Sequence, residues 1–189
     1  MKQSGFPTAL LAAIAILLGE GHSYAAPEIS ARNNDLDNPI IVVVHADRAQ
    51  YSLADNIEIS VSLLNTGKSV IYVDRRMFWT GLSGSLALCF ADEHGTRIPA
   101  RAMSDAMMPP PPENDPSILV RLEPGFFYGT SIKLALKDFF TRPGRYSVRV
   151  AYQSMLPKKF VAPQLRDLPA QWSSSPTIMS EQTWIDIVQ

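Results

Sequence analysis

Alternation of apolar and polar side chains along short segments constrains the fold of this 189-residue chain more than any other feature. In residues 57–63, aliphatic side chains alternate with Glu or Ser at every second position. An extended chain with this period places one set of side chains on a core and the other in water. The segment is therefore predicted to be a strand with one buried face. Its aliphatic set is Ile57, Ile59, Val61 and Leu63.

Similar segments recur along the rest of the chain, and Gly and Pro turns separate them. They are residues 40–44, 70–73, 86–90, 118–122, 128–134, 146–152 and 185–187. About eight short strands at this spacing, without long helical periodicity, are typical of an all-β sandwich or barrel. The continuous β-branched run at 40–44 predicts a strand that is buried on both faces or lies at a sheet edge.

A tight turn is predicted between two of these strands. Asn65-Thr66-Gly67-Lys68 supplies turn residues, and Gly67 is free to adopt positive φ. We therefore expect residues 57–64 and 70–73 to pair as a β-hairpin.

The N-terminus has the order of residues found in a secretory signal peptide. Lys2 precedes ten apolar residues from Ala9 to Leu18, and Ser23 and Ala25 place small residues before a cleavage point. A membrane-spanning helix needs about 20 apolar residues, so no stable membrane anchor is expected after cleavage. Residues 1–25 are predicted to be removed, residues 26–39 to form a flexible leader, and the protein to be exported to the periplasm or the medium.

Charge and cysteine content limit the possible partners. The predicted signal contains Lys2 and Glu20, so its removal leaves the net charge of the chain at −1. This balance argues against nucleic acid or an anionic membrane as the main partner. Cys89 is the one cysteine and cannot form an internal disulfide, and we interpret it as a packed thiol.

Two long connections and one short cluster are the predicted interaction sites. Residues 103–116 contain two adjacent methionines followed by a run of four prolines, and residues 156–176 contain four prolines and an aromatic side chain that is expected to be exposed. Loops longer than about 12 to 15 residues are uncommon unless they are functional or disordered. The candidate residues are Arg75, Arg76, Phe78, Trp79, Met107, Met108, Pro109, Pro110, Pro111, Pro112 and Trp172. Each set also has a structural interpretation, because an aromatic pair is often core and a proline run can simply cover one end of the fold.

Several of these segments resemble bacterial immunoglobulin-like domains, including those of the intracellular proteinase inhibitor type. The resemblance lies in residues 57–64 with the turn into 70–73, in Leu122-Glu123-Pro124-Gly125, and in residues 143–148. The step from Gly144 to Tyr146 is similar to the tyrosine corner, in which the phenol bonds to the backbone upstream. The resemblance implies an immunoglobulin-like antiparallel β-sandwich over residues 40–189. No inhibitory loop aligns with the chain. The layout also resembles the β domain of some secreted metallopeptidases, whose His-Glu-x-x-His motif the sequence lacks.

Candidate catalytic groups are few. Only His45 and His94 remain after the predicted cleavage, whereas a zinc site usually needs three or four converging ligands. His45 could meet Asp47, and His94 lies in a turn beside acidic residues. Gly81-Leu82-Ser83-Gly84-Ser85 lacks the second glycine of a nucleophile elbow. We expect no cofactor and no metal.

The sequence therefore favours a noncatalytic exported module that recognises another envelope or extracellular protein through its long proline-bearing loops. A secreted peptidase inhibitor is the alternative that the family resemblance implies. A small hydrolase that uses His45 or His94 is a second alternative.

Overall fold

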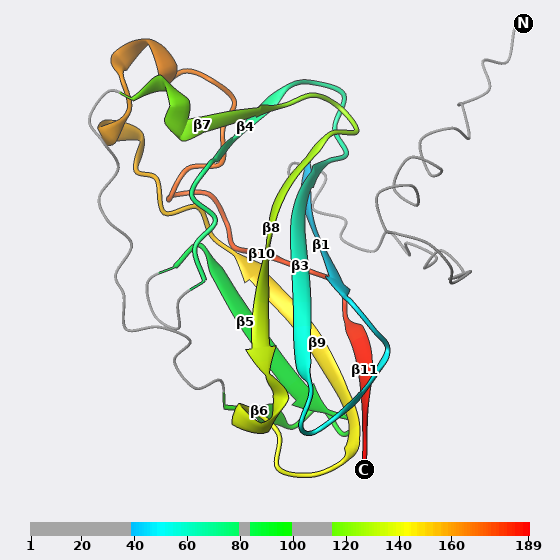
Figure 1. The fold of residues 1–189 in the computed structure, drawn as a ribbon. Helices are drawn as coiled ribbons and strands as arrows, with labels where there is room; N and C mark the ends of the chain where they lie inside the picture. The colour runs from blue at the N-terminus through cyan, green and yellow to red at the C-terminus, as the bar shows by residue number, and fades with distance from the viewer. Residues whose placement is uncertain (1–38, 80–83, 100–114) are drawn as a thin grey trace, which may run out of the picture. The chain divides into compact units, whose positions relative to one another are not determined.

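The computed structural model describes residues 39–79, 84–99 and 115–189, which form β-strands joined by turns and short 3-10 helices (Figure 1). This content confirms the predicted all-β class. The strands are β1 (Ile40–Ala46), β2 (Gln50–Ser52), β3 (Asn56–Asn65), β4 (Ile71–Asp74), β5 (Leu86–Asp92), β6 (Arg97–Ile98), β7 (Leu119–Leu122), β8 (Phe127–Ala135), β9 (Gly144–Tyr152), β10 (Ile178–Met179) and β11 (Thr183–Val188). The 3-10 helices are η1 (Pro116–Ile118), η2 (Leu136–Asp138), η3 (Lys158–Phe160) and η4 (Pro163–Leu165).

The strands form two main sheets and a separate ribbon. The smaller sheet has the order β1-β3-β8, and every pair in it is antiparallel. The larger sheet has the order β2-β11-β9-β5-β6, with β10 also paired to β9, and its β2–β11 pair is parallel. Strands β4 and β7 form the ribbon, which extends beyond one end of the sheets in Figure 1.

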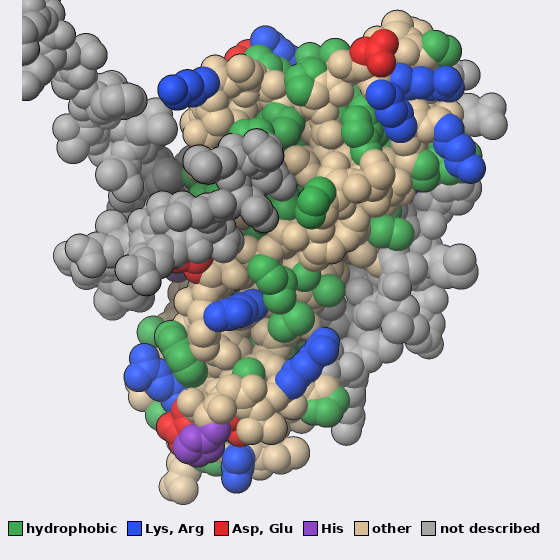
Figure 2. All heavy atoms as spheres, turned by 180° about the vertical axis from the view of Figure 1, so that it is seen from behind, with side chains coloured by type: hydrophobic (Ala, Val, Ile, Leu, Met, Phe, Trp, Pro, Cys, Tyr) green, Lys and Arg blue, Asp and Glu red, His purple; other side chains and the backbone are tan. Residues whose placement is uncertain are grey.

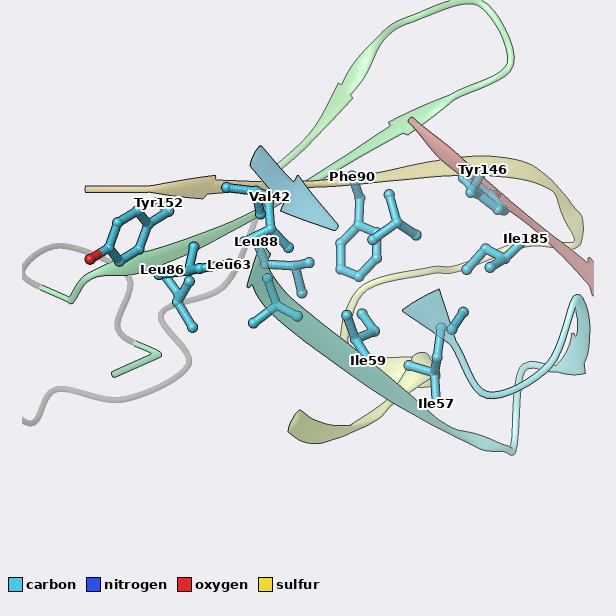
Figure 3. Close-up of a cluster of buried hydrophobic side chains, with 14 of the residues drawn as sticks. Val42, Ile57, Ile59, Leu63, Leu86, Leu88, Phe90, Tyr146, Tyr152 and Ile185 are labelled. Atoms are coloured by element: carbon cyan, nitrogen blue, oxygen red, sulfur yellow. The ribbon is translucent and has the colours of Figure 1, made fainter. Parts of the chain in front are cut away.

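One hydrophobic core lies between the two sheets, as the labelled side chains of Figure 3 show. The predicted alternation is confirmed in β3, where the four side chains predicted to be buried are at most 1% exposed. Strand β9 buries Tyr146, Val148, Val150 and Tyr152, and the last strand buries Ile185 and Ile187. In these three strands, the period of two therefore predicted correctly which side chains enter the core.

All eight predicted strand segments are strands, and the prediction missed three short ones. These are β2, β6 and β10, each of two or three residues, which is too short for a visible alternation. The run at 40–44 lies in β1, at an edge of the smaller sheet, which is one of the two placements predicted for it.

The predicted hairpin between residues 57–64 and 70–73 is wrong. Strand β3 pairs with β1 and β8, whereas β4 pairs with β7. The buried side chain of Asn65 ends β3: its amide nitrogen donates to the carbonyl oxygens of Ser69 and Leu122, at 2.8 and 3.0 Å. Gly67 is not among the glycines with positive φ. A Cβ at Gly67 would lie 2.6 Å from the side chain of Pro39, so glycine is needed there for a close approach.

The connection at 156–176 is a packed segment and not an open loop. It contains η3 and η4, and Ala170 forms a bridge with Tyr72 beside β4. Its apolar side chains and those of the ribbon form a second hydrophobic cluster. The buried members are Ile118, Leu119, Leu156, Val161 and Trp172. Proline content alone therefore overestimated how open this connection is.

Two buried tyrosines of β9 allow a matched test of hydrogen bonding. The phenol of Tyr146 donates to the carbonyl oxygen of Arg142 at 2.9 Å, as the tyrosine-corner resemblance predicted. The phenol of Tyr152 is 1% exposed and has no hydrogen-bond partner among the described residues. We expect Tyr146→Phe to lower the free energy of unfolding by about 1 kcal/mol, since it removes a satisfied bond. Tyr152→Phe should leave the stability unchanged or raise it, because it removes an unsatisfied buried hydroxyl. Urea unfolding of both variants measures the difference, and equal losses would contradict it.

Candidate functional site

The structure separates the predicted interaction residues by exposure. Met107, Met108 and Pro109 to Pro112 lie outside the described residues. Trp172 was expected to be exposed, but this is wrong: its side chain is 9% exposed and packs in the second hydrophobic cluster. Trp172 therefore stabilises the fold.

The cluster from Arg75 to Trp79 is held firmly in place. The guanidinium of Arg76 donates to both carboxylate oxygens of Asp74, at 3.1 and 2.9 Å, and Asp74 is fully buried. The hydroxyl of Ser85 accepts from the Phe78 N–H and donates to the Arg76 carbonyl oxygen. Phe78 and Trp79 are half-buried, and Trp79 packs against the main core. Within this cluster, the side chain of Arg75 is exposed. Most of the cluster therefore supports the link between the ribbon and the larger sheet.

The two histidines occupy different elements and lack a catalytic arrangement. His45 is exposed on β1, and the partner that was expected for it is engaged elsewhere: the carboxylate of Asp47 accepts from the Tyr51 hydroxyl and the Glu58 N–H, at 2.8 and 2.7 Å. Burial alone would raise the pKa of Asp47, but these bonds and the guanidinium of Arg48 outweigh it and hold the pKa below its usual value. His94 lies in the exposed β5–β6 turn, 3.7 Å from Glu93. Neither histidine is placed to exchange a proton with a buried partner among the described residues.

A different surface has the composition of a binding site. Residues of β11, β9, β10, β5 and β6 point outward from the larger sheet and meet in cross-strand register. Trp184 lies opposite Ser147, which lies opposite Ala91, and Ala91 lies opposite Arg97. We call this surface the tryptophan face. Its members are Ala87, Cys89, Ala91, Arg97, Arg145, Ser147, Arg149, Ala151, Met179, Trp184 and Asp186.

Large exposed side chains of the tryptophan face rise from a floor of small residues. Trp184 is 38% exposed and Met179 is 40% exposed, whereas Ser147 is buried. The guanidinium of Arg145 lies 5.0 Å from the centre of the Trp184 ring, within cation–π distance. Figure 2, seen from behind, shows hydrophobic side chains beside Lys and Arg side chains on the surface. Because the neighbouring side chains are small, those of Trp184 and Arg145 project together from the tryptophan face.

Positive charge is in excess on the tryptophan face. Arg145 forms an ion pair with Asp186 at 3.9 Å, and Arg149 donates to the neutral side chain of Gln182 at 3.0 Å. Among the described residues, neither Arg149 nor Arg97 forms an ion pair. The face therefore presents more guanidinium groups than carboxylates.

The sequence contained a signal for Trp184 that went unused. Because Ile185 and Ile187 were predicted to point inward, the parity of that strand places Trp184 on the outer face. The arginines could not be assigned to the same face, since this requires the order β11-β9-β5-β6, which alternation does not encode.

Within the described part of the chain, no helix is long and apolar enough to span a membrane. The same residues contain no group of three or more His, Cys, Asp or Glu side chains that could hold a metal ion.

Comparison with known proteins adds little to this description. No family model and no curated protein matches the chain. One similar solved structure is a novel β-glucosidase from Erythrobacter marinus, at 20% identity and a TM-score of 0.34. The alignment covers 79% of this chain and 16% of the β-glucosidase chain. A likeness at this level supports no conclusion about fold family or activity.

Proposed function

We propose that the protein is a noncatalytic exported binding module that recognises another envelope or extracellular protein. The observation that carries the proposal is the tryptophan face, where Trp184, Met179 and three arginines surround small residues. Trp, Met and Arg are enriched at protein interfaces, and Trp and Arg dominate binding hot spots. The excess of guanidinium groups favours a partner surface that carries carboxylates.

We also propose that the two sheets form an immunoglobulin-like sandwich, in which β1-β3-β8 face β5-β9-β11. Support comes from the core between the sheets and from the bond between Tyr146 and the Arg142 carbonyl oxygen. In this arrangement the tryptophan face is the solvent side of one sheet. A rigid sheet holds its outward side chains at fixed spacing and so lowers the entropy cost of binding.

Replacing Trp184 should abolish most of the binding to the partner protein. The full chain is immobilised and exposed to an envelope fraction, and recovered proteins are quantified by mass spectrometry. We expect Trp184→Ala to reduce recovery of the specific partner by at least about tenfold, because hot-spot tryptophans contribute about 2 kcal/mol or more. Binding should also weaken with added salt, since exposed guanidinium groups contribute to it.

Two control arms make this test decisive. Phe126→Ala removes an aromatic side chain that is 63% exposed and lies off the tryptophan face, so recovery should not change. A deletion of residues 107–112 tests the proline-bearing loop separately. If Trp184→Ala recovers the same proteins as the unchanged chain, the tryptophan face is not the binding site.

Export makes its own prediction. Expression of the full chain in a bacterial host should yield a processed protein that begins at Ala26, because Ser23 and Ala25 place small residues at the positions the peptidase inspects. Ala25→Leu should remain unprocessed at this site. Intact-mass measurement distinguishes the two forms, and an unprocessed unchanged chain in the cytoplasm would exclude export.

A further inference from the structure

Strand β8 is a long open edge of the smaller sheet. It pairs with β3 through nine consecutive residues without a bulge, and within the described residues no strand pairs with its other side. The other edge of this sheet is covered: β1 contacts β9, β10 and β11, and the hydroxyl of Thr183 donates to the Val44 carbonyl oxygen. The outer strands of the larger sheet, β2 and β6, have three and two residues.

The register shows which backbone groups of β8 point away from the sheet. The N–H of Asn65 donates to the Phe126 carbonyl oxygen, and the N–H of Leu136 donates to the Asp55 carbonyl oxygen. In an antiparallel pair, hydrogen-bonded residues alternate with residues whose N–H and C=O point the other way. Even-numbered residues of β8 therefore bond to β3. The residues whose backbone groups face the open side are Phe127, Gly129, Ser131, Lys133 and Ala135.

This edge has few of the features that usually block pairing. Natural edge strands are protected by charged side chains, prolines, bulges or short length. Strand β8 has no proline and a single charged residue, Lys133, whose ammonium lies 3.7 Å from Glu58 on the neighbouring strand. The strand begins beside two exposed aromatic residues, Phe126 and Phe127, which are 63% and 52% exposed.

We propose that β8 pairs antiparallel with β8 of a second copy of the chain, so that the two smaller sheets become continuous. The register that pairs all nine residues is centred on Ser131, which then faces its own copy. It places Lys133 opposite Gly129 and Phe127 opposite Ala135, so no like charges meet and the large side chain faces a small one. On the core side, Tyr128 meets Leu134 and Thr130 meets Ile132.

One strand pair makes a modest interface. Stable interfaces bury about 1,200 to 2,000 Å² in total, and a nine-residue strand is only about 30 Å long. We therefore expect a dimer that depends on concentration between about 1 µM and about 1 mM.

Sedimentation of the full chain after export tests the dimer. The unchanged chain should shift from monomer to dimer as concentration rises. Ser131→Pro should remain monomeric, because it removes an N–H from the open side while leaving the bonds to β3 intact. Ser131→Val keeps the N–H and should dimerise, as should Trp184→Ala, which alters the other sheet.

Cross-linking tests the register and does not depend on the proline variant folding. In a Cys89→Ser background and with oxidised glutathione added as the oxidant, Ser131→Cys should form an intermolecular disulfide, since facing Cα atoms in such a pair lie about 5.5 Å apart. Lys133→Cys lies on the same edge, is also exposed, and faces Gly129 of the second copy, so it should cross-link at least about tenfold more slowly.

A chain that stays monomeric at about 1 mM, or that captures a foreign extended peptide on β8 in place of its copy, overturns the proposal. A dimer that persists in a folded Ser131→Pro variant, or equal cross-linking of the two cysteine variants, places the interface elsewhere.

Discussion

Asp74→Ala is expected to lower the free energy of unfolding by about 3–5 kcal/mol, because it breaks a buried ion pair from one side. Asp74 ends β4 and is fully buried. Its carboxylate accepts three hydrogen bonds from Arg76: one from the backbone N–H at 2.9 Å and two from the guanidinium. Without the carboxylate, a guanidinium whose side chain is only 18% exposed loses this ion pair and the two hydrogen bonds within it.

Breaking the Asp74–Arg76 pair should destabilise more than β4, because of where the pair lies in the fold. Asp74 is the last residue of the ribbon strand, and the segment that follows it leads into β5 of the larger sheet. In the same segment, the Arg75 carbonyl oxygen accepts a hydrogen bond from the phenol of Tyr128 in β8, at 2.9 Å. On the side of the larger sheet, the Ser85 hydroxyl donates to the Arg76 carbonyl oxygen, and the Ser85 carbonyl oxygen accepts the N–H of Gln153, which follows β9. The segment that the pair fixes therefore bonds to both sheets.

Chemical denaturation with a surface control measures the effect. Asp167→Ala removes an ion pair with Lys158 in which the two side chains are 97% and 52% exposed, and it should cause no measurable change. Asp74→Asn keeps the volume and some hydrogen bonding, so its loss should lie between the two. An Asp74→Ala variant as stable as the unchanged chain would show that the pair contributes nothing to the link.

The sequence predicted the parts of the fold that depend on local interactions and did not predict the parts that depend on contacts distant in sequence. Alternation identified the buried side chains of β3, β9 and β11, because the period of two depends only on the strand itself. Pairing depends on contacts that are distant in sequence, and the bond from Asn65 to the Leu122 carbonyl oxygen spans 57 positions. The predicted hairpin failed for this reason.

The candidate site likewise has features that follow from local pattern and features that depend on distant contacts. Nothing periodic marks residues 156–176, so the burial of Trp172 in a second cluster was not predictable from pattern. The outward position of Trp184 follows from strand parity, but the other members of the tryptophan face come mostly from four other strands. A binding surface that is assembled across a sheet needs the strand order, which only the structure supplies.

Asn65→Ala is expected to cost about 3 kcal/mol, the second large effect, because one buried side chain satisfies three backbone groups. Its amide nitrogen donates to the carbonyl oxygens of Ser69 and Leu122, and its Oδ1 accepts the Gly67 N–H at 2.9 Å. The backbone of Asn65 also bonds to Gly125 and Phe126, so the side chain lies where β3, the 66–69 turn and the end of β7 meet. Alanine would leave the buried Leu122 carbonyl oxygen without this donor.

Comparing Asn65→Ala with Asn65→Asp separates the effect of hydrogen bonding from the effect of side-chain volume. Asn65→Asp has nearly the same shape but cannot donate to the two carbonyl oxygens, so it should be at least as destabilising as alanine at neutral pH, where its charge would be buried. Thr66→Ala removes an exposed hydroxyl that donates to the Pro39 carbonyl oxygen at 3.0 Å, and its loss should be below about 1 kcal/mol. Thermal and urea unfolding give the ranking. If Asn65→Ala and Thr66→Ala lose equal stability, the side chain of Asn65 does not hold β3 to β7, and the pairing of β4 with β7 must be specified by the strands themselves.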